Sequence, residues 1–275
     1  MIVKILKRLF IILVLLFLYL PILILAVYSF TSSTQIGAIR GFSLKNYVTL
    51  VTTPELTGMI AGTISLAVAA ALIATVLGTM GALGAFYSGR KMSSMITTLN
   101  QIPVINADVV TGFSICILLV VAFHISKDSY IPLLAGHVTL CAPFVFLSVM
   151  PRITQMDPSI YEAALDLGAT PFRALIEVVI PQIVPGIISG FALAVTLSLD
   201  DYFIATYTKP ATFDTISTYV VNATRGSDTT IKTALWALSA VIFVIVLIVV
   251  VLINVFEKKS FPLEWKVSAK PTDEV

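Results

Sequence analysis

Three aspartates lie inside strongly apolar stretches of the sequence: Asp108, Asp200 and Asp201. If these stretches span a membrane, each carboxylate costs about 2.5–3.5 kcal/mol on insertion scales, so residues of this kind are candidates for function. Carboxylates pair with ammonium groups, and aromatic faces such as those of Tyr47 and Tyr202 also attract cations. These residue types together predict a pathway that suits a positively charged solute.

Each aspartate also has a structural interpretation. Pro103 can break the helix that precedes Asp108, and Asp108 would then cap the second piece. Asp200 and Asp201 could instead mark the outer end of a helix. Because adjacent residues point about 100° apart on a helix, the two carboxylates cannot face one cavity equally. We therefore expect one of them to face the pathway and the other to cap a helix or pair within the protein.

The sequence offers no set of residues for catalysis or for a metal site. His124 and His137 have no matching ligands, and Cys116 and Cys141 lie in apolar runs as packing residues. No Ser-His-Asp or His-Glu-x-x-His arrangement is found, and the phosphate-cradling Gly-x-x-x-x-Gly-Lys-Ser/Thr loop is absent. We expect a chain that is not an enzyme and binds no cofactor itself, with an intramembrane enzyme as the remaining alternative. The net charge of +2 is too small to suggest a nucleic-acid partner.

The composition is that of an integral membrane protein with an all-α fold. The chain is 58% hydrophobic and 12% charged, whereas a soluble domain carries roughly 25% charged residues. A spanning helix needs about 20 mainly apolar residues. We predict one transmembrane domain over residues 1–275 with six spanning helices, at 9–29, 58–87, 101–124, 130–150, 184–207 and 234–256.

The basic residues indicate how these spans are oriented. With the N-terminus inside, the inner segments hold eleven of the 17 Lys and Arg residues and the outer segments hold six. The positive-inside rule therefore predicts that both termini are cytoplasmic. The larger inner loop is then 151–183, and we expect a mobile polar tail at 262–275. Small residues at the spacing that lets helices pack closely in lipid recur in two spans: Gly58 and Gly62, Gly78, Gly81 and Gly84, Gly186 and Gly190.

The pattern of the inner loop predicts two short helices joined by a glycine turn. Asp157-Pro158 combines a capping residue with one suited to the first helical position, and Thr170-Pro171 repeats this combination. Gly168 is placed to end the first helix. We expect Pro181 and Pro185 to close the segment before the fifth span.

The first of these short helices carries Glu162 and Asp166 and no basic residue. A helix that lies on lipid usually carries Lys and Arg on its polar face. A protein partner therefore explains this segment better than a membrane surface does.

The inner loop also resembles a known signature. Glu162-Ala163-Ala164, Gly168 and Ile180-Pro181, placed before the penultimate span, are similar to the coupling motif of importer-type ABC transporter permeases. The resemblance implies that this loop docks into a groove on a separate ATPase subunit, which binds the ATP. The residues it assigns to this contact are Tyr161, Glu162, Ala163, Ala164, Leu167, Gly168 and Pro181. It further implies two ATPase subunits, a second and different permease subunit, an extracytoplasmic solute-binding protein and a bacterial inner-membrane location.

A second resemblance concerns the solute. The stretch 197–202, the group Pro103, Asp108 and Gly112, and the stretch 42–47 resemble the polyamine branch of these permeases. The resemblance implies uptake of spermidine or putrescine by alternating access. The chain has Asn46 where that branch commonly has Trp, which leaves the identity of the amine open. The alternatives are a permease for another small solute, and a channel or scaffold subunit that is not driven by ATP.

Overall fold

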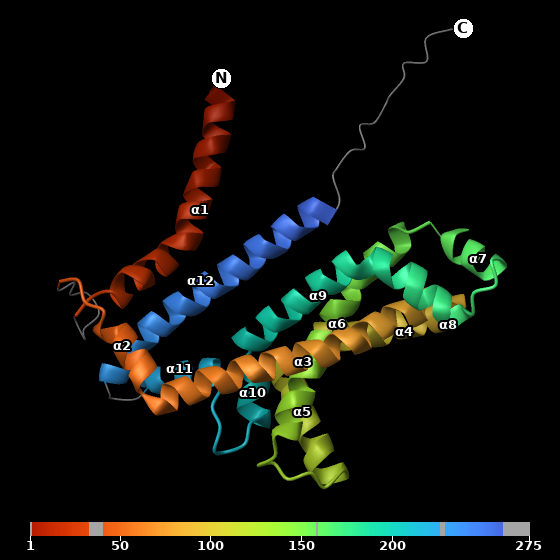
Figure 1. Cartoon of the computed structure of the whole chain (residues 1–275). Helices are drawn as coiled ribbons and strands as arrows, with labels where there is room; N and C mark the ends of the chain where they lie inside the picture. The colour runs from red at the N-terminus through yellow and green to blue at the C-terminus, as the bar shows by residue number, and fades with distance from the viewer. Residues whose placement is uncertain (1, 33–40, 158, 226–228, 261–275) are drawn as a thin grey trace.

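The computed structural model describes residues 2–32, 41–157, 159–225 and 229–260, whose regular elements are helices (Figure 1). The long helices are α1 (Ile2–Ser29), α3 (Pro54–Tyr87), α4 (Arg90–Ile105), α6 (Tyr130–Gln155), α9 (Ile180–Asp200) and α12 (Thr229–Ser260). The short ones are α2 (Lys45–Thr52), α5 (Asp108–Ile117), α7 (Ser159–Asp166), α8 (Pro171–Ala174), α10 (Phe203–Thr208) and α11 (Ile216–Arg225), with π-helical turns η1 (Leu118–Ala122) and η2 (Leu175–Val179). The predicted all-α fold is confirmed, and the predicted tail at 262–275 lies outside the described residues.

The main core lies between α3, α6 and α9. The side chains that α3 contributes are alanines, whereas α6 supplies larger ones. Helices in lipid associate through close packing, because the lipid tails are as apolar as the side chains themselves. Small residues on one helix therefore let the larger residues of its neighbour approach closely. The core members from α6 are Cys141, Val145, Phe146, Val149 and Ile153.

Three of the predicted packing glycines lie at the closest helix contacts. A Cβ atom added at Gly78 would lie 2.7 Å from the carbonyl oxygen of Ala142 and from Cβ of Val145. Gly190 approaches Val145 and Gly186 approaches Arg152 in the same way. By contrast, Gly58 and Gly84 have no such neighbour within 4 Å among the described residues. The spacing of glycines therefore identified the packed faces of α3 and α9, but not every glycine on them.

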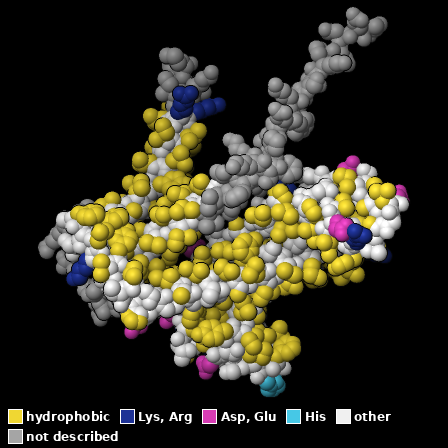
Figure 2. All heavy atoms as spheres, in the orientation of Figure 1, with side chains coloured by type: hydrophobic (Ala, Val, Ile, Leu, Met, Phe, Trp, Pro, Cys, Tyr) yellow, Lys and Arg dark blue, Asp and Glu magenta, His cyan; other side chains and the backbone are white. Residues whose placement is uncertain are grey.

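A second apolar cluster joins α2, α3, α11 and α12, with members such as Leu50, Leu56 and Leu238. α1 stands away from this body and approaches it near its C-terminal end, where the ring of Tyr28 lies 5.5 Å from that of Trp236 on α12 (Figure 1). Figure 2 shows hydrophobic side chains over the middle of the visible face, with charged ones mainly toward its ends. This distribution is expected for a surface that meets lipid.

Four helices in the described residues are long and apolar enough to cross a membrane: Leu6–Ser29, Pro54–Tyr87, Tyr130–Gln155 and Pro171–Asp200. They correspond to the spans predicted at 9–29, 58–87, 130–150 and 184–207. A fifth span results if α4 and the helix Asp108–Ala122 are counted as one. Within the sixth predicted span, the described part of α12 has a shorter apolar stretch, Thr233–Ile248. The protein is thus a multi-pass helical membrane protein, and the number six stays a prediction.

The predicted third span, 101–124, is not one straight helix. α4 begins at Arg90, and it meets the following helix at an angle of 106°. Pro103 lies inside α4, and the break comes at Asn106 and Ala107, whose backbone is extended. Pro103 removes one N–H from the hydrogen-bond ladder and crowds the preceding turn, which weakens the last turn of α4, and the helix ends two residues later at Ile105.

The predicted fifth span, 184–207, has different ends. α9 stops at Asp200, because Asp201 takes an extended conformation before α10 begins. At its inner end the helix continues back to Pro171, so Pro181 and Pro185 do not close the preceding segment as expected. The π-turn η2 explains this continuity: the N–H of Ile180 bonds to the carbonyl of Leu175, one residue further back than in an α-helix. Pro181 then falls in the first positions of α9, where proline is tolerated.

Gly78→Ala should lower the free energy of unfolding by about 1–3 kcal/mol, because the new methyl group has to push α3 away from α6. Gly84→Ala is the matched control, since nothing lies within 4 Å of the added Cβ and alanine is the better helix former. Thermal unfolding of both variants in one detergent measures the difference. Equal unfolding temperatures for the two variants would contradict the proposed α3–α6 contact.

Candidate functional site

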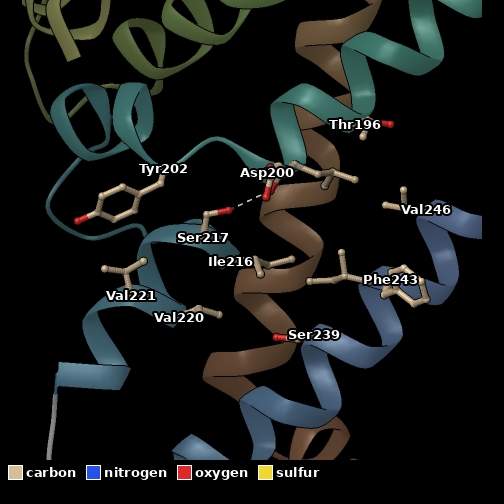
Figure 3. A pocket seen from close by; sticks show the side chains of 12 residues that line it. Thr196, Asp200, Tyr202, Ile216, Ser217, Val220, Val221, Ser239, Phe243 and Val246 are labelled. Carbon is tan, nitrogen blue, oxygen red and sulfur yellow. Dashed lines mark hydrogen bonds between the residues drawn. The ribbon is translucent and has the colours of Figure 1, made fainter. Parts of the chain in front are cut away.

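A pocket of about 530 Å³ lies between the C-terminal end of α9, α11 and α12 (Figure 3). This volume is in the range of small-molecule sites, which are mostly apolar with a few polar groups. Its walls are apolar side chains such as Val220, Phe243 and Val246, with the hydroxyls of Thr196, Ser217 and Ser239 at intervals. Of the described residues that line it, Asp200 is the one with a charged side chain.

Asp200 and Asp201 are directed to different places, because α9 ends between them. Asp200 is the last residue of α9, is exposed and lines the pocket together with Tyr202. Asp201 has an extended backbone and is only 8% exposed. The structure thus places Asp200 at the pocket and turns Asp201 into the protein interior, while the ring of Tyr202 points away from Asp200 (Figure 3). Their participation in a solute pathway stays a prediction.

The carboxylate of Asp201 is held by the start of α10. Its Oδ1 accepts a hydrogen bond from the N–H of Ile204 (3.2 Å), and its Oδ2 accepts one from Ala205 (2.7 Å). Nε2 of His137, on α6, lies 3.7 Å from the same Oδ2. The sequence analysis treated His137 only as an unlikely metal ligand and missed this pairing. A buried titratable side chain needs a polar partner. The position of His137 in an apolar stretch of sequence could therefore have indicated that it pairs with a second polar residue.

Asp108 and Tyr47 do not line this pocket. Asp108 is the first residue of α5 and is exposed, and Ala107 rather than Asp108 occupies the capping position. A carboxylate in the first helical turn still interacts favourably with the helix dipole. The hydroxyl of Tyr47 lies 2.8 Å from that of Ser29, and its ring packs on Phe30 with 5.0 Å between centroids. For both residues the predicted pathway role remains untested by this geometry.

Asn46, which stands where the polyamine branch commonly has Trp, is buried. Its side-chain N–H₂ donates to the carbonyl oxygens of Ser29 (3.0 Å) and Thr31 (3.2 Å). Asn46 therefore links α2 to the end of α1, because its amide donates hydrogen bonds to carbonyl oxygens at and just beyond the C-terminal end of that helix, where the helix itself supplies no N–H groups.

The first predicted helix of the inner segment forms as α7, whereas the second begins at Pro171 as predicted but continues into α9 instead of ending before it. The predicted capping residues Asp157 and Thr170 accept hydrogen bonds at these two helix starts, and Pro158 lies outside the described residues. Oδ1 of Asp157 accepts a hydrogen bond from the N–H of Ser159 (3.0 Å), and hydrogen bonds from Ser159 lower the pKa of the Asp157 carboxyl. Oγ1 of Thr170 accepts from the N–H of Arg173 (3.3 Å), with Pro171 in the first turn of α8. These are local interactions, which explains why the sequence alone could predict them.

Gly168 ends α7 in a left-handed conformation with φ +89°. The N–H of Gly168 bonds to the carbonyl of Leu165 (2.9 Å), and that of Ala169 bonds to the carbonyl of Ala164 (3.1 Å). This pair of bonds is the Schellman motif, which satisfies the last carbonyls of a helix and favours glycine. The predicted glycine turn is confirmed.

The turn at Gly168 presents large apolar side chains to the outside. Leu167 is 89% exposed and Phe172, which the sequence analysis did not single out, is 73% exposed. Of the predicted coupling residues, Glu162, Ala163, Gly168 and Pro181 are also exposed, while Ala164 and Tyr161 are partly buried. The ring of Tyr161 packs on that of Tyr87 at the end of α3, 4.8 Å away. Tyr161 thus packs against the end of α3, and its contact with an ATPase stays a prediction.

Comparison with known proteins identifies the family. Residues 74–261 match the family described as binding-protein-dependent transport system inner membrane component. The chain belongs to this family. The resemblance to importer-type ABC permeases is thereby confirmed.

Two relatives and two solved structures illustrate the similarity. The putrescine transport system permease protein PotI of Escherichia coli (strain K12) is 34% identical over 76% of each chain. The spermidine/putrescine transport system permease protein PotC of Haemophilus influenzae is 28% identical over 93% of this chain and 97% of that one. A bacterial ABC transporter involved in the import of the acidic polysaccharide alginate shares the fold, with a TM-score of 0.71 at 20% identity over 94% of this chain and 95% of that one. The alginate transporter crystallised with an alginate-bound periplasmic protein also shares it, with a TM-score of 0.70 at 18% identity over 94% of both chains.

In this permease, Gly168→Ala should destabilise the turn after α7 by about 1 kcal/mol, because a side chain at positive φ is strained even though space is open. Gly168→Asn should lose less, since asparagine tolerates this conformation. Hydrogen exchange of the Ala169 amide, which makes the longer Schellman bond, reports the opening of the turn. Slower exchange in the alanine variant than in the asparagine variant would contradict this account.

Proposed function

We propose that this permease is one transmembrane subunit of an ATP-driven importer that moves polyamines into the cytoplasm. The observation that carries the choice of solute is the single carboxylate of Asp200 in an otherwise uncharged, mainly apolar pocket. A polyamine consists of ammonium groups separated by methylene chains. An ammonium group can pair with Asp200 while the methylenes pack on the apolar walls.

The names of the relatives support the same class of solute. PotI and PotC carry putrescine and spermidine/putrescine in their names, and their similarity extends over most of this chain. Tyr202 borders the same pocket, but its ring points away from Asp200 (Figure 3), so the ammonium contact is assigned to Asp200. The amine itself, whether putrescine or spermidine, stays open in this proposal.

The inner segment supports coupling to a separate ATPase. Leu167 and Phe172 are two large apolar side chains on either side of a rigid glycine turn, and such exposed anchors suit a groove on a partner. We include in the proposal two ATPase subunits that bind the ATP, a second and different permease subunit, and an extracytoplasmic solute-binding protein. The chain itself then performs no ATP hydrolysis.

The proposed topology has six spans and both termini in the cytoplasm of a bacterial cell. The broken helices α4–α5 and the stretch Thr233–Ile248 would supply the two spans beyond the four long ones. Charged side chains at the ends of the visible face agree with an apolar band in the lipid (Figure 2). Transport would proceed by alternating access, with ATP-driven motion of the inner segment passed to the spans.

The alternative within the family is a permease for another small solute. The alternative outside this mechanism is a channel or scaffold subunit without an ATPase. Among the described residues that line the pocket, none besides Asp200 is charged, which favours a positively charged solute over a zwitterion, because a zwitterion requires both signs for recognition.

Asp200→Asn should lower putrescine uptake by at least about tenfold in proteoliposomes that contain the assembled importer, because a charged partner for the ammonium group is lost. Glu55→Gln is the control, since Glu55 is an exposed carboxylate in the first turn of α3 and does not line the pocket. Wild-type uptake by the Asp200 variant would remove this residue from the proposed solute contact.

Phe172→Ser should weaken co-purification of the ATPase subunits by at least about tenfold, since an apolar anchor in a partner groove is worth about 2 kcal/mol or more. Val51→Ser is the matched control: Val51 is 72% exposed on α2, at the opposite end of the molecule from α7 (Figure 1). Unchanged ATPase binding in the Phe172 variant, or an equal loss in the Val51 variant, would count against the proposed docking surface.

A further inference from the structure

His137 and Asp201 form a buried polar pair whose hydrogen bonds are incomplete. His137 is 0% exposed, and Leu133, one turn earlier on α6, is buried beside it. In the described part of the chain, Nε2 of His137 has no hydrogen-bond partner. It lies 3.7 Å from Oδ2 of Asp201, which is close enough for an ion pair. Burying a ring nitrogen without a hydrogen bond costs free energy, so the protonation state of Nε2 matters for the stability of the pair.

The hydrogen bonds restrict which protons are present. Nδ1 of His137 lies 2.9 Å from the carbonyl oxygen of Leu133, and a carbonyl can only accept. Nδ1 therefore carries a proton. If Nε2 had none, its lone pair would face the carboxylate lone pairs of Asp201 across 3.7 Å with no donor between them. A net negative charge would then be buried against an unpaired acceptor, which the apolar surroundings oppose.

One additional proton removes this conflict. It can reside on Nε2, which gives an imidazolium beside a carboxylate, or on Asp201, which gives a carboxyl group beside a neutral imidazole. In both arrangements the pair is neutral overall and a proton lies between Nε2 and Oδ2. The low dielectric of the interior strengthens such a link compared with water.

The pair sits at the point that fixes α10. Ile204, the second residue of α10, packs against Gly112 of α5 and Gly136 of α6 so closely that a Cβ on either glycine would lie within 3 Å of it. Gly136 immediately precedes His137, and Asp201 accepts the first N–H bonds of α10. The contact between His137 and Asp201 therefore links α6 to the helix break between the end of α9 at Asp200 and the start of α10.

We infer that His137 and Asp201 share a buried proton and that this pair is the positioning element for Asp200. With the link in place, the chain leaves α9 at Asp200 and enters α10, so that Asp200 borders the pocket. Without the proton, repulsion between the pair would loosen α10 and displace Asp200. The role assigned to Asp200 rests on the proposed function, whereas the shared proton does not.

Other titratable groups around the pair are few among the described residues. Cys141 lies one turn after His137 on α6, and its thiol donates to the carbonyl of Ala194 on α9 (3.3 Å). Asp108 on α5 is near enough for its charge to act on Asp201. A second negative charge nearby makes a bare, unshared Asp201 carboxylate less favourable still.

The first experiment observes the proton directly. The chain has two histidines, and His124 is exposed at φ +54°, a conformation that asparagine tolerates. His124→Asn thus leaves His137 as the sole histidine for ¹⁵N NMR of the labelled ring in the assembled importer at pH 7. We expect a protonated Nε2, or a protonated carboxyl band in the infrared spectrum that disappears in Asp201→Asn. A bare Nε2 without that band would overturn the inference.

The second experiment tests positioning. His137→Leu leaves the carboxylate unpaired, so the putrescine KM of the assembled importer should rise by at least about tenfold. Adding Asp201→Asn removes the unpaired charge while the amide oxygen still caps α10, and it should recover at least about half of that rise on a logarithmic scale. An unchanged KM in His137→Leu, or no recovery in the double variant, would show that the pair does not act through charge on Asp200.

The two experiments separate this inference from the proposed function. If Asp200→Asn leaves putrescine uptake intact, the proposed solute contact fails, and the NMR result still decides whether the proton is shared. If His137→Leu does not assemble, thermal unfolding of the double variant replaces uptake as the readout. If the double variant, His137→Leu with Asp201→Asn, is no more stable than His137→Leu alone, the charge pairing is overturned.

Discussion

The capping of α10 by Asp201 is the interaction on which the arrangement of this end of the protein depends. A helix can stop in an apolar environment only if its free backbone groups find partners. The carboxylate supplies two acceptors for the N–H groups of Ile204 and Ala205, so α10 can begin directly after the break. At the end of α9, the carbonyl oxygen of Leu199 accepts a hydrogen bond from the hydroxyl of Ser217 (3.0 Å). The exposed carboxylate at the pocket and the buried one beside His137 are two results of the same break.

The packing of α3, α6 and α9 provides the fixed frame around that break. Gly78, Gly186 and Gly190 let backbones approach where a methyl group would clash. Contacts of this kind depend on shape, so they resist displacement of one helix relative to the next. α10 is packed in a similar way, because Ile204 fits closely between two glycines of neighbouring helices.

Sequence analysis predicted best the features that depend on neighbouring residues. The caps at Asp157 and Thr170 and the turn at Gly168 are formed within a few residues, so local chemistry determined them. A break near Pro103 and a helix end at Asp200 and Asp201 were among the predicted alternatives, and both are found. The residues at which the chain turns, Asn106 and Asp201, depend on packing against helices distant in sequence. The contact between His137 and Asp201 joins residues 64 positions apart, and nothing in the local pattern of either indicates the other. The pocket likewise needed three helices to be placed before Asp200 could be distinguished from Asp201.

The uninterrupted helix from Pro171 to Asp200 has a mechanical consequence. Its 30 residues connect the glycine turn and Phe172 to the pocket without a loop, although the ribbon bends between α8 and α9 (Figure 1). α9 is held against α6 at Gly186 and Gly190, where the two helices approach closely. Because no loop interrupts the helix on either side of this contact, a displacement of the turn would be transmitted through it toward Asp200.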